Sequence, residues 1–230
     1  MEADPHYKLL PGRVFDRLQQ EYPEHEQLPT ASFPDEMLGH VVQHRFRVAA
    51  NDWPLIQLGP GILTVNDTAK YIWPDFRARA LAACRTLFEA YPKSSELRIE
   101  SLVLRYIDAV DFDYSTEDAF AFLRDKMKVS IALPPDLFGQ PDVARTPKHL
   151  MWQTMFECRQ PSGVVQLRFA TGQRHDKPAI IWETTVQSAK NAMPPMPDGF
   201  EPWLDAAHKI TGDWFFKLID GELKRRFSGE

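Results

Sequence analysis

An arginine and a tyrosine stand side by side in an apolar run near the middle of the chain, Leu104-Arg-Tyr-Ile-Asp108. A guanidinium can bind a carboxylate or a phosphate through two parallel hydrogen bonds. We therefore predict Arg105 and Tyr106 as ligand-binding residues. The alternative for Arg105 is an internal salt bridge or an exposed strand position, because an unpaired buried guanidinium is costly. Arg105 and Asp108 are three residues apart, so they point to opposite faces of a strand unless a bulge intervenes.

Acidic residues are concentrated around the end of this run, at Asp108, Asp111, Asp113, Glu117 and Asp118. Oxygen-rich groups of this kind are what Mg²⁺ and Ca²⁺ prefer. The spacing, however, lacks the central glycine and the terminal glutamate of a calcium loop. A solvated strand end that leads into a helix with an acidic first turn explains the same residues. We therefore predict no metal site, and a site formed by these carboxylates is the alternative.

The histidines and cysteines show no pattern typical of catalysis. His40 and His44 share one face of a predicted strand about 13 Å apart, so one metal ion cannot bridge them directly. Cys84 and Cys158 are too few for a disulfide framework and lie in apolar segments, which predicts small core residues. The chain contains neither a P-loop nor a Gly-x-Ser-x-Gly motif. We assign no catalytic residue and no cofactor.

The clearest local signal specifies a turn. Gly59-Pro60-Gly61 joins two β-rich runs, at residues 55–58 and 62–65. Glycine tolerates positive φ and proline fixes φ near −65°, so this tripeptide can reverse the chain and pair the two runs as a hairpin. The segment therefore predicts architecture and no chemistry.

Helix and strand patterns continue along the rest of the chain. Pro74 fits the first turn of a helix that ends before Pro92, and the polar residues at 66–68 offer N-cap side chains. A long strand is predicted at 97–112, with a bulge near Ser101 that reconciles its two parities. The remaining predicted elements are a helix capped by Ser115 or Thr116, strands at 150–158, 164–170 and 179–186, and a C-terminal helix at 201–227 with Trp203, Ala207, Ile210, Trp214 and Leu218 on one face.

These elements predict an α+β fold, with an antiparallel sheet, packed helices and a long C-terminal helix. Residues 1–35 contain five prolines and are predicted as a proline-punctuated N-terminal segment that wraps the domain. Residues 36–230 are predicted as a single domain. One interpretation divides this domain near 130–148 into two packed β-β-β-α halves, and the other has a single curved sheet that grips the final helix.

Three stretches of the chain resemble an uncharacterised, sporadically distributed prokaryotic protein family of about this length. They are residues 56–66 with 71–73, residues 104–108, and residues 208–227. Their order and spacing match the family over most of 40–227. The family has no established activity, so the resemblance implies no catalytic residue. Its patchy distribution implies a mobile or defence-associated gene neighbourhood.

Charge and composition exclude some functions. The net charge of −5 argues against broad attraction to nucleic acid. No run approaches the roughly 18 apolar residues of a membrane span, and the first residues lack the order of a secretion signal, which predicts a cytoplasmic protein without membrane contact. We expect a non-enzymatic binding or regulatory protein that docks a protein partner, in a prokaryotic defence or toxin-neutralising system. The alternative is a small-molecule-binding protein or enzyme with a pocket between the sheet and the C-terminal helix.

Overall fold

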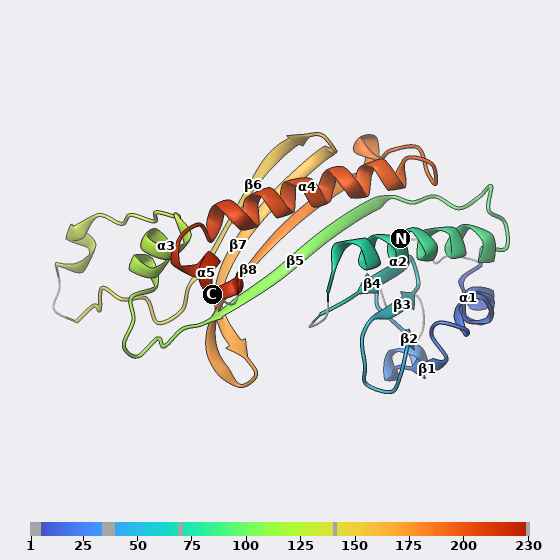
Figure 1. Cartoon of the computed structure of the whole chain (residues 1–230), viewed down its shortest axis with the longest axis horizontal. Coiled ribbons are helices and arrows are strands. Elements are labelled where there is room, and N and C mark those ends of the chain that lie inside the picture. Colours follow the sequence, from blue (N-terminus) through green and yellow to red (C-terminus); the bar gives the residue numbers. More distant parts are fainter. Residues whose placement is uncertain (1–5, 34–39, 69–70, 140–141, 229–230) are drawn as a thin grey trace. The chain divides into compact units, whose positions relative to one another are not determined.

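The computed structural model describes residues 6–33, 40–68, 71–139 and 142–228 (Figure 1). The chain forms two compact units, one of Met1–Ile99 with Pro195–Glu201 and the other of Glu100–Pro194 with Pro202–Glu230. It passes from the first unit to the second at residues 99–100, ahead of the division that the sequence placed near 130–148. The physical reason is that Leu123, which precedes that connection, is buried in the core of the second unit.

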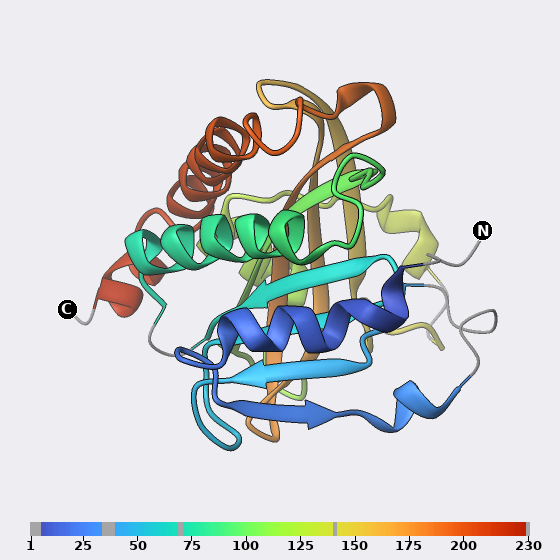
Figure 2. The ribbon, with the colours of Figure 1, turned by 90° about the vertical axis from the view of Figure 1, so that its right-hand side faces the viewer.

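The first unit is built on a four-stranded antiparallel sheet whose strands follow the order of the chain. The strands are β1 (Glu24–Gln27), β2 (His44–Arg47), β3 (Leu55–Gly59) and β4 (Ile62–Asn66). The helices are α1 (Leu10–Leu18) and α2 (Trp73–Ala90), with 3-10 turns η1 (Tyr7–Leu9) and η2 (Pro29–Ser32). Both α-helices pack on the sheet face that carries Phe46 and Ile56 (Figure 2). Val14 and Tyr22 are buried in the same core, so the proline-punctuated segment is an integral part of this unit.

The predicted hairpin is confirmed. Strands β3 and β4 pair as far as Gly59 and Ile62, which leaves Pro60 and Gly61 as a two-residue turn. Gly61 has φ +67°, and a Cβ at this position would lie 2.7 Å from Nδ1 of His40. Both the backbone angle and the available space therefore require glycine.

The second unit is built on a longer antiparallel sheet with the strand order β5-β8-β7-β6. The strands are β5 (Ser101–Asp111), β6 (Met151–Arg159), β7 (Ser162–Arg174) and β8 (Lys177–Ala189). The helices are α3 (Ala119–Met127), α4 (Phe200–Leu218) and α5 (Glu222–Ser228), with 3-10 turns η4 (Pro135–Phe138) and η5 (Lys190–Ala192). All three α-helices pack on the face that carries Phe169 and Trp182, which we call the inner face, and α4 runs along it (Figure 1). The opposite face is the outer face.

This architecture confirms the α+β class, the antiparallel pairing and a C-terminal helix. The two sheets differ in strand order, and a repeated β-β-β-α unit stays a prediction. None of the helices in the described ranges combines the length and the apolar character needed to cross a bilayer.

Two predictions on the long strand and the helix after it are wrong. Strand β5 begins at Ser101 and pairs with β8 without interruption, from Ser101 opposite Ala189 to Asp111 opposite Ala179. The residues before Ser101 lie outside the strand, so their parity requires no bulge. Helix α3 is capped by Asp118, whose carboxylate accepts hydrogen bonds from two backbone N–H groups, and not by Ser115 or Thr116.

The ends of the other helices also differ from the prediction. Helix α2 has Pro74 in its first turn, as predicted, but Ile72 is its N-cap and Asn66 belongs to β4. The predicted single helix at 201–227 is interrupted, because Gly221 with φ +115° separates α4 from α5. The buried face of α4 consists of Trp203, Leu204, Ala207 and Thr211, and Trp214 on the same helix is half-buried.

Candidate functional site

Strand β5 separates the two residues that were predicted to bind a ligand. Its even-numbered residues face the helices, as the burial of Leu102 and Leu104 shows, and its odd-numbered residues face outward. Successive side chains of a strand point to opposite faces, so Tyr106 lies on the inner face and Arg105 on the outer face. The structure does not bring the two side chains together, and each has its own set of neighbours.

Tyr106 belongs to a polar cluster on the inner face. Its hydroxyl shares a hydrogen bond of 2.9 Å with Nδ1 of His208 on α4. Asp108 follows two residues later on the same face, and burial raises its pKa to about 6. Burial lowers the pKa of His208, against the opposing attraction of Asp205. Both shifts have the same main cause, because burial disfavours the charged form of each group.

Aromatic side chains fill the neighbouring part of the inner face. Trp182 is fully buried and stacks on Phe215, with ring centroids 6.3 Å apart. Trp203 donates a hydrogen bond of 2.7 Å from Nε1 to the hydroxyl of Ser188. A surface hollow of about 190 Å³ is lined by Ala109, Val110, Arg174 and Phe227. This hollow is smaller than the roughly 300–1,000 Å³ of a small-molecule pocket.

The outer face of the second sheet carries one apolar row, and its other rows combine apolar with polar side chains. The apolar row crosses all four strands with the side chains of Met151, Ala170, Ile181 and Ala109. On the outer face, four large apolar side chains of the edge strands are exposed, and we call them the outer apolar group: Val103 and Ile107 on β5, Met151 and Met155 on β6. Met151 is the most open of them, with 75% of its surface exposed.

Arg105 belongs to an ion cluster on the same outer face. Arg168 donates from Nη1 to Glu183 at 2.8 Å, and Nε of Arg105 lies 3.7 Å from the other oxygen of Glu183. Glu183 is largely buried, whereas 53% of the Arg105 side chain is exposed. Two guanidinium groups and one carboxylate leave a formal charge of +1. Because Arg105 approaches Glu183 through Nε, its other N–H groups can bind a carboxylate from a partner.

The acidic residues around the end of β5 have separate structural roles. Asp113 accepts hydrogen bonds from the backbone N–H and the hydroxyl of Ser115, which lower the pKa of Asp113. Glu117 accepts from the N–H of Asp113, Asp118 caps α3, and Asp111 lies on the outer face. Within the part of the chain that the structure describes, no three His, Cys, Asp or Glu side chains gather as metal ligands would.

A histidine pair that sequence spacing did not predict lies in the first unit. Antiparallel pairing of β1 with β2 brings Nε2 of His25 within 3.0 Å of Nδ1 of His44. Burial and then the charge of His25 lower the pKa of His44. Cys84 and Cys158 are half-buried, and burial raises the pKa of Cys84 to about 11. The Cys84 thiol is therefore protonated at neutral pH and a weak nucleophile.

The residues that sequence reasoning missed are those that strand pairing alone brings together. Arg168 and Glu183 stand opposite each other on β7 and β8, fifteen residues apart in the chain. Period-two alternation within each predicted strand could have identified the outward residues, but not their neighbours on other strands. Comparisons of this chain with protein-family models, with curated proteins and with solved structures find no match.

Proposed function

We propose that this chain is a non-enzymatic binding protein that docks a protein partner on the outer face of the second sheet. The observation that carries the proposal is the outer apolar group beside a half-exposed arginine. Methionine and arginine are enriched in protein interfaces, and charged residues other than arginine are depleted at their centres. A surface of this composition is suited to a protein partner.

The arrangement of these side chains supports the proposal more strongly than their exposure does. A single exposed apolar residue is ordinary, because much of any protein surface is apolar. Here Val103, Ile107, Met151 and Met155 share one sheet face with the fully apolar row that crosses all four strands. These exposed apolar side chains alternate with polar ones along both edge strands, and apolar surface rimmed by polar residues is typical of interaction sites. The flexible side chains of Met151 and Met155 can adapt to the shape of a partner.

The alternative function, a small-molecule site between the sheet and the C-terminal helix, has less support. Trp182, Phe169 and Phe215 pack together in that region, and Tyr106 is engaged with His208. A cytoplasmic location and a role in prokaryotic defence or toxin neutralisation remain predictions from the sequence and from the family resemblance.

A matched pair of substitutions tests the proposed function. Val103 and Val143 are exposed to 53% and 51%, and only Val103 lies on the outer sheet face. We expect Val103→Glu to reduce recovery of a specific partner chain from native-host lysate at least about tenfold, which corresponds to about 1.4 kcal/mol. Val143→Glu should leave recovery within about twofold of the parent protein. Both variants should unfold at the same denaturant concentration as the parent.

Two results would contradict the proposal. One is equal recovery of the same partner chain by the parent protein and by folded Val103→Glu. The other is loss of that chain with Val143→Glu alone, which would place the docking surface outside the sheet.

A further inference from the structure

Strand β5 forms one edge of the second sheet, where none of the described strands pairs with it. The N–H of Phe112 donates to the carbonyl of Pro178, and the N–H of Lys190 donates to the carbonyl of Glu100. Glu100 and Phe112, which flank β5, are both even-numbered. In an antiparallel pair, every second residue of a strand forms its backbone hydrogen bonds with the same neighbouring strand. The odd-numbered residues of β5 therefore direct their N–H and C=O groups away from β8.

These outward backbone groups have no backbone partner among the described residues. The six residues concerned are Ser101, Val103, Arg105, Ile107, Ala109 and Asp111. The strand is eleven residues long, has no proline or glycine, and pairs with β8 without a bulge. Natural edge strands are commonly protected by proline, bulges, shortness, charged side chains or a covering segment. The β5 edge has none of the first three, and its outward charges, on Arg105 and Asp111, restrict pairing to a strand that complements them.

We propose that the protein partner adds an extended strand to the edge of β5, a mode that rests on the proposed function and specifies the partner. The same odd residues carry their side chains on the outer face. A strand paired with them therefore places alternate side chains beside Val103, Arg105 and Ile107. A carboxylate there complements the half-exposed Arg105 and the +1 charge of its cluster. The partner segment has the pattern apolar-x-acidic-x-apolar.

A second copy of this chain fits the edge less well than such a segment. Antiparallel self-pairing of two β5 strands about Asp108 places Arg105 opposite Asp111 of the copy, because both are three residues from the centre. The same register places Asp108 directly opposite its own copy, and like charges in that position are destabilising. Self-pairing about Arg105 opposes two guanidinium groups, and self-pairing about Ile107 places Arg105 opposite Ala109, which offers no carboxylate. The charge pattern therefore favours a different chain that supplies the carboxylate.

A synthetic peptide provides the probe, namely acetyl-Lys-Val-Thr-Glu-Thr-Val-Lys-amide, tested on the full chain. Amide hydrogen exchange by NMR separates the two sets of β5 amides. In the free protein we expect Leu104 and Tyr106, which bond to β8, to exchange at least about tenfold more slowly than Val103, Arg105 and Ile107. Saturating peptide should slow exchange of the three odd-numbered amides at least about tenfold and leave the even-numbered amides unchanged.

Two control peptides separate backbone pairing from charge. Replacing the central Glu by Lys should weaken binding about tenfold, because it removes the charge complement of Arg105. Methylating the peptide amides that face β5 should abolish binding, because they can no longer donate. Ile107→Pro removes an outward N–H without removing a bond to β8 and should abolish peptide binding. Val143→Pro, at an exposed position outside the sheet, should leave peptide binding within about threefold of the parent.

Several results would overturn the strand-addition mode. They are slow exchange of Val103, Arg105 and Ile107 in the free monomer, slow exchange that accompanies a concentration-dependent dimer, and unchanged exchange with saturating peptide. If the peptide fails while folded Val103→Glu still loses its partner, the edge mode is wrong and outer-face docking stands. If the peptide binds while Val103→Glu keeps its partner, the docking surface proposed above is wrong.

Discussion

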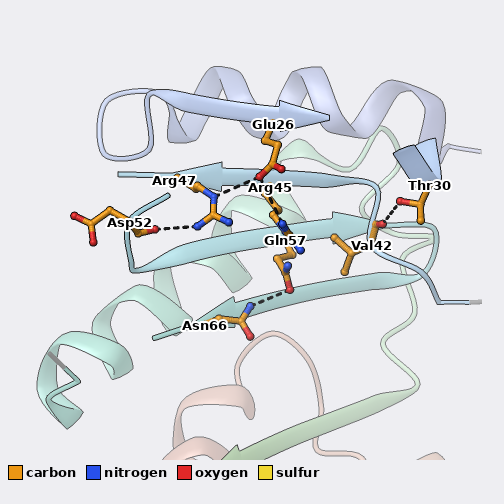
Figure 3. Close-up of polar contacts among 8 residues, drawn as sticks. All are labelled: Glu26, Thr30, Val42, Arg45, Arg47, Asp52, Gln57 and Asn66. Atoms are coloured by element: carbon orange, nitrogen blue, oxygen red, sulfur yellow. Dashed lines mark hydrogen bonds and ion pairs between the residues drawn. The ribbon is translucent and has the colours of Figure 1, made fainter. Parts of the chain in front are cut away.

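The outer faces of the two sheets differ although both sheets are four-stranded and antiparallel with helices on one side. In the first sheet, one row crosses all four strands with Glu26, Arg45, Gln57 and Thr64. Glu26 lies 3.6 Å from Arg45 and 3.4 Å from Arg47, and Gln57 accepts a hydrogen bond from Asn66 (Figure 3). Thr64 also donates to Gln57. In the second sheet, one row is wholly apolar, from Met151 to Ala109, and the next row on the same face carries Gln153, Arg168 and Glu183.

This difference shows that the architecture alone does not decide what a sheet presents. Polar side chains on the first sheet satisfy one another across the strands, which is how a face in contact with water is ordinarily completed. The second sheet exposes apolar side chains and a partly compensated arginine instead. Water does not solvate apolar side chains favourably, so covering them with a partner lowers the free energy. We therefore place the docking surface on the second sheet.

The largest expected effect tests whether the inner face of the second sheet carries the stability. Trp182→Ala should lower the free energy of unfolding by about 3–5 kcal/mol, because a fully buried indole leaves a cavity among Phe169 and Phe215. Trp214→Ala should cost less, about 1–3 kcal/mol, because Trp214 is half-buried. Urea denaturation measures both values. A smaller loss for Trp182→Ala than for Trp214→Ala would contradict this account of the core.

The next effect concerns the turn that sets the register of the first sheet. Gly61→Val should destabilise the protein by about 1–3 kcal/mol, because φ +67° is strained for a β-branched residue and the added Cβ would meet His40. Gly12→Ala is the control, since a Cβ at Gly12 meets nothing within 4 Å. Denaturant midpoints that fall equally for both variants would show that the turn geometry is not responsible.

A pH-dependent effect is expected from Asp108 on the inner face of the second sheet. Burial raises the pKa of Asp108 from 3.8 to about 6. Between these two pH values, the carboxyl is protonated in the folded protein and ionised in the unfolded chain. Stability from this group is present below the ordinary pKa and is lost as pH rises toward 6. Asp108→Asn removes this loss and should be about 1–2 kcal/mol more stable than the parent at pH 7.5. The two proteins should be nearly equal at pH 3.5.

Thermal unfolding of the parent and Asp108→Asn across this pH range measures the difference directly. A constant difference between the two proteins at all pH values would show that Asp108 has an ordinary pKa.

The smallest effect is expected on the outer face itself. Ile107→Thr should change stability by less than about 0.5 kcal/mol, because the side chain is exposed and threonine keeps the β-branch. Arg45→Ala on the first sheet should cost about 1 kcal/mol, because Arg45 contacts Glu26 in a polar row. Guanidinium denaturation distinguishes the two. A larger loss for Ile107→Thr would indicate that the outer face is packed within the chain.

The fold was predictable wherever a local pattern decided the structure. Gly61 and Pro60 specified the hairpin through their own backbone preferences, and the alternation of Leu102 and Leu104 specified the buried face of β5. Helix ends were harder to predict, because several residues compete as caps. Asp118 caps α3 where Ser115 also qualified, and Gly221 interrupts a continuous apolar pattern.

The candidate site was predictable only in part. Arg105 was identified from its residue type, but its neighbours Glu183 and Arg168 depend on the strand order β5-β8-β7. That order places the first strand of the sheet beside the last, a long-range pairing that no local period encodes. Tyr106 was assigned to the same site as Arg105, whereas the pleat directs it to His208.

Site-specific photocrosslinking in native-host cells tests the central claim most directly. A benzophenone side chain would replace Met155 on the outer face of the second sheet or, as the control, the exposed Glu24 on β1 of the first unit. We expect the Met155 position to yield one discrete crosslinked protein, and the Glu24 position to yield none above background. Equal crosslinking from both positions, or a discrete product from Glu24 alone, would contradict a docking surface on the second sheet.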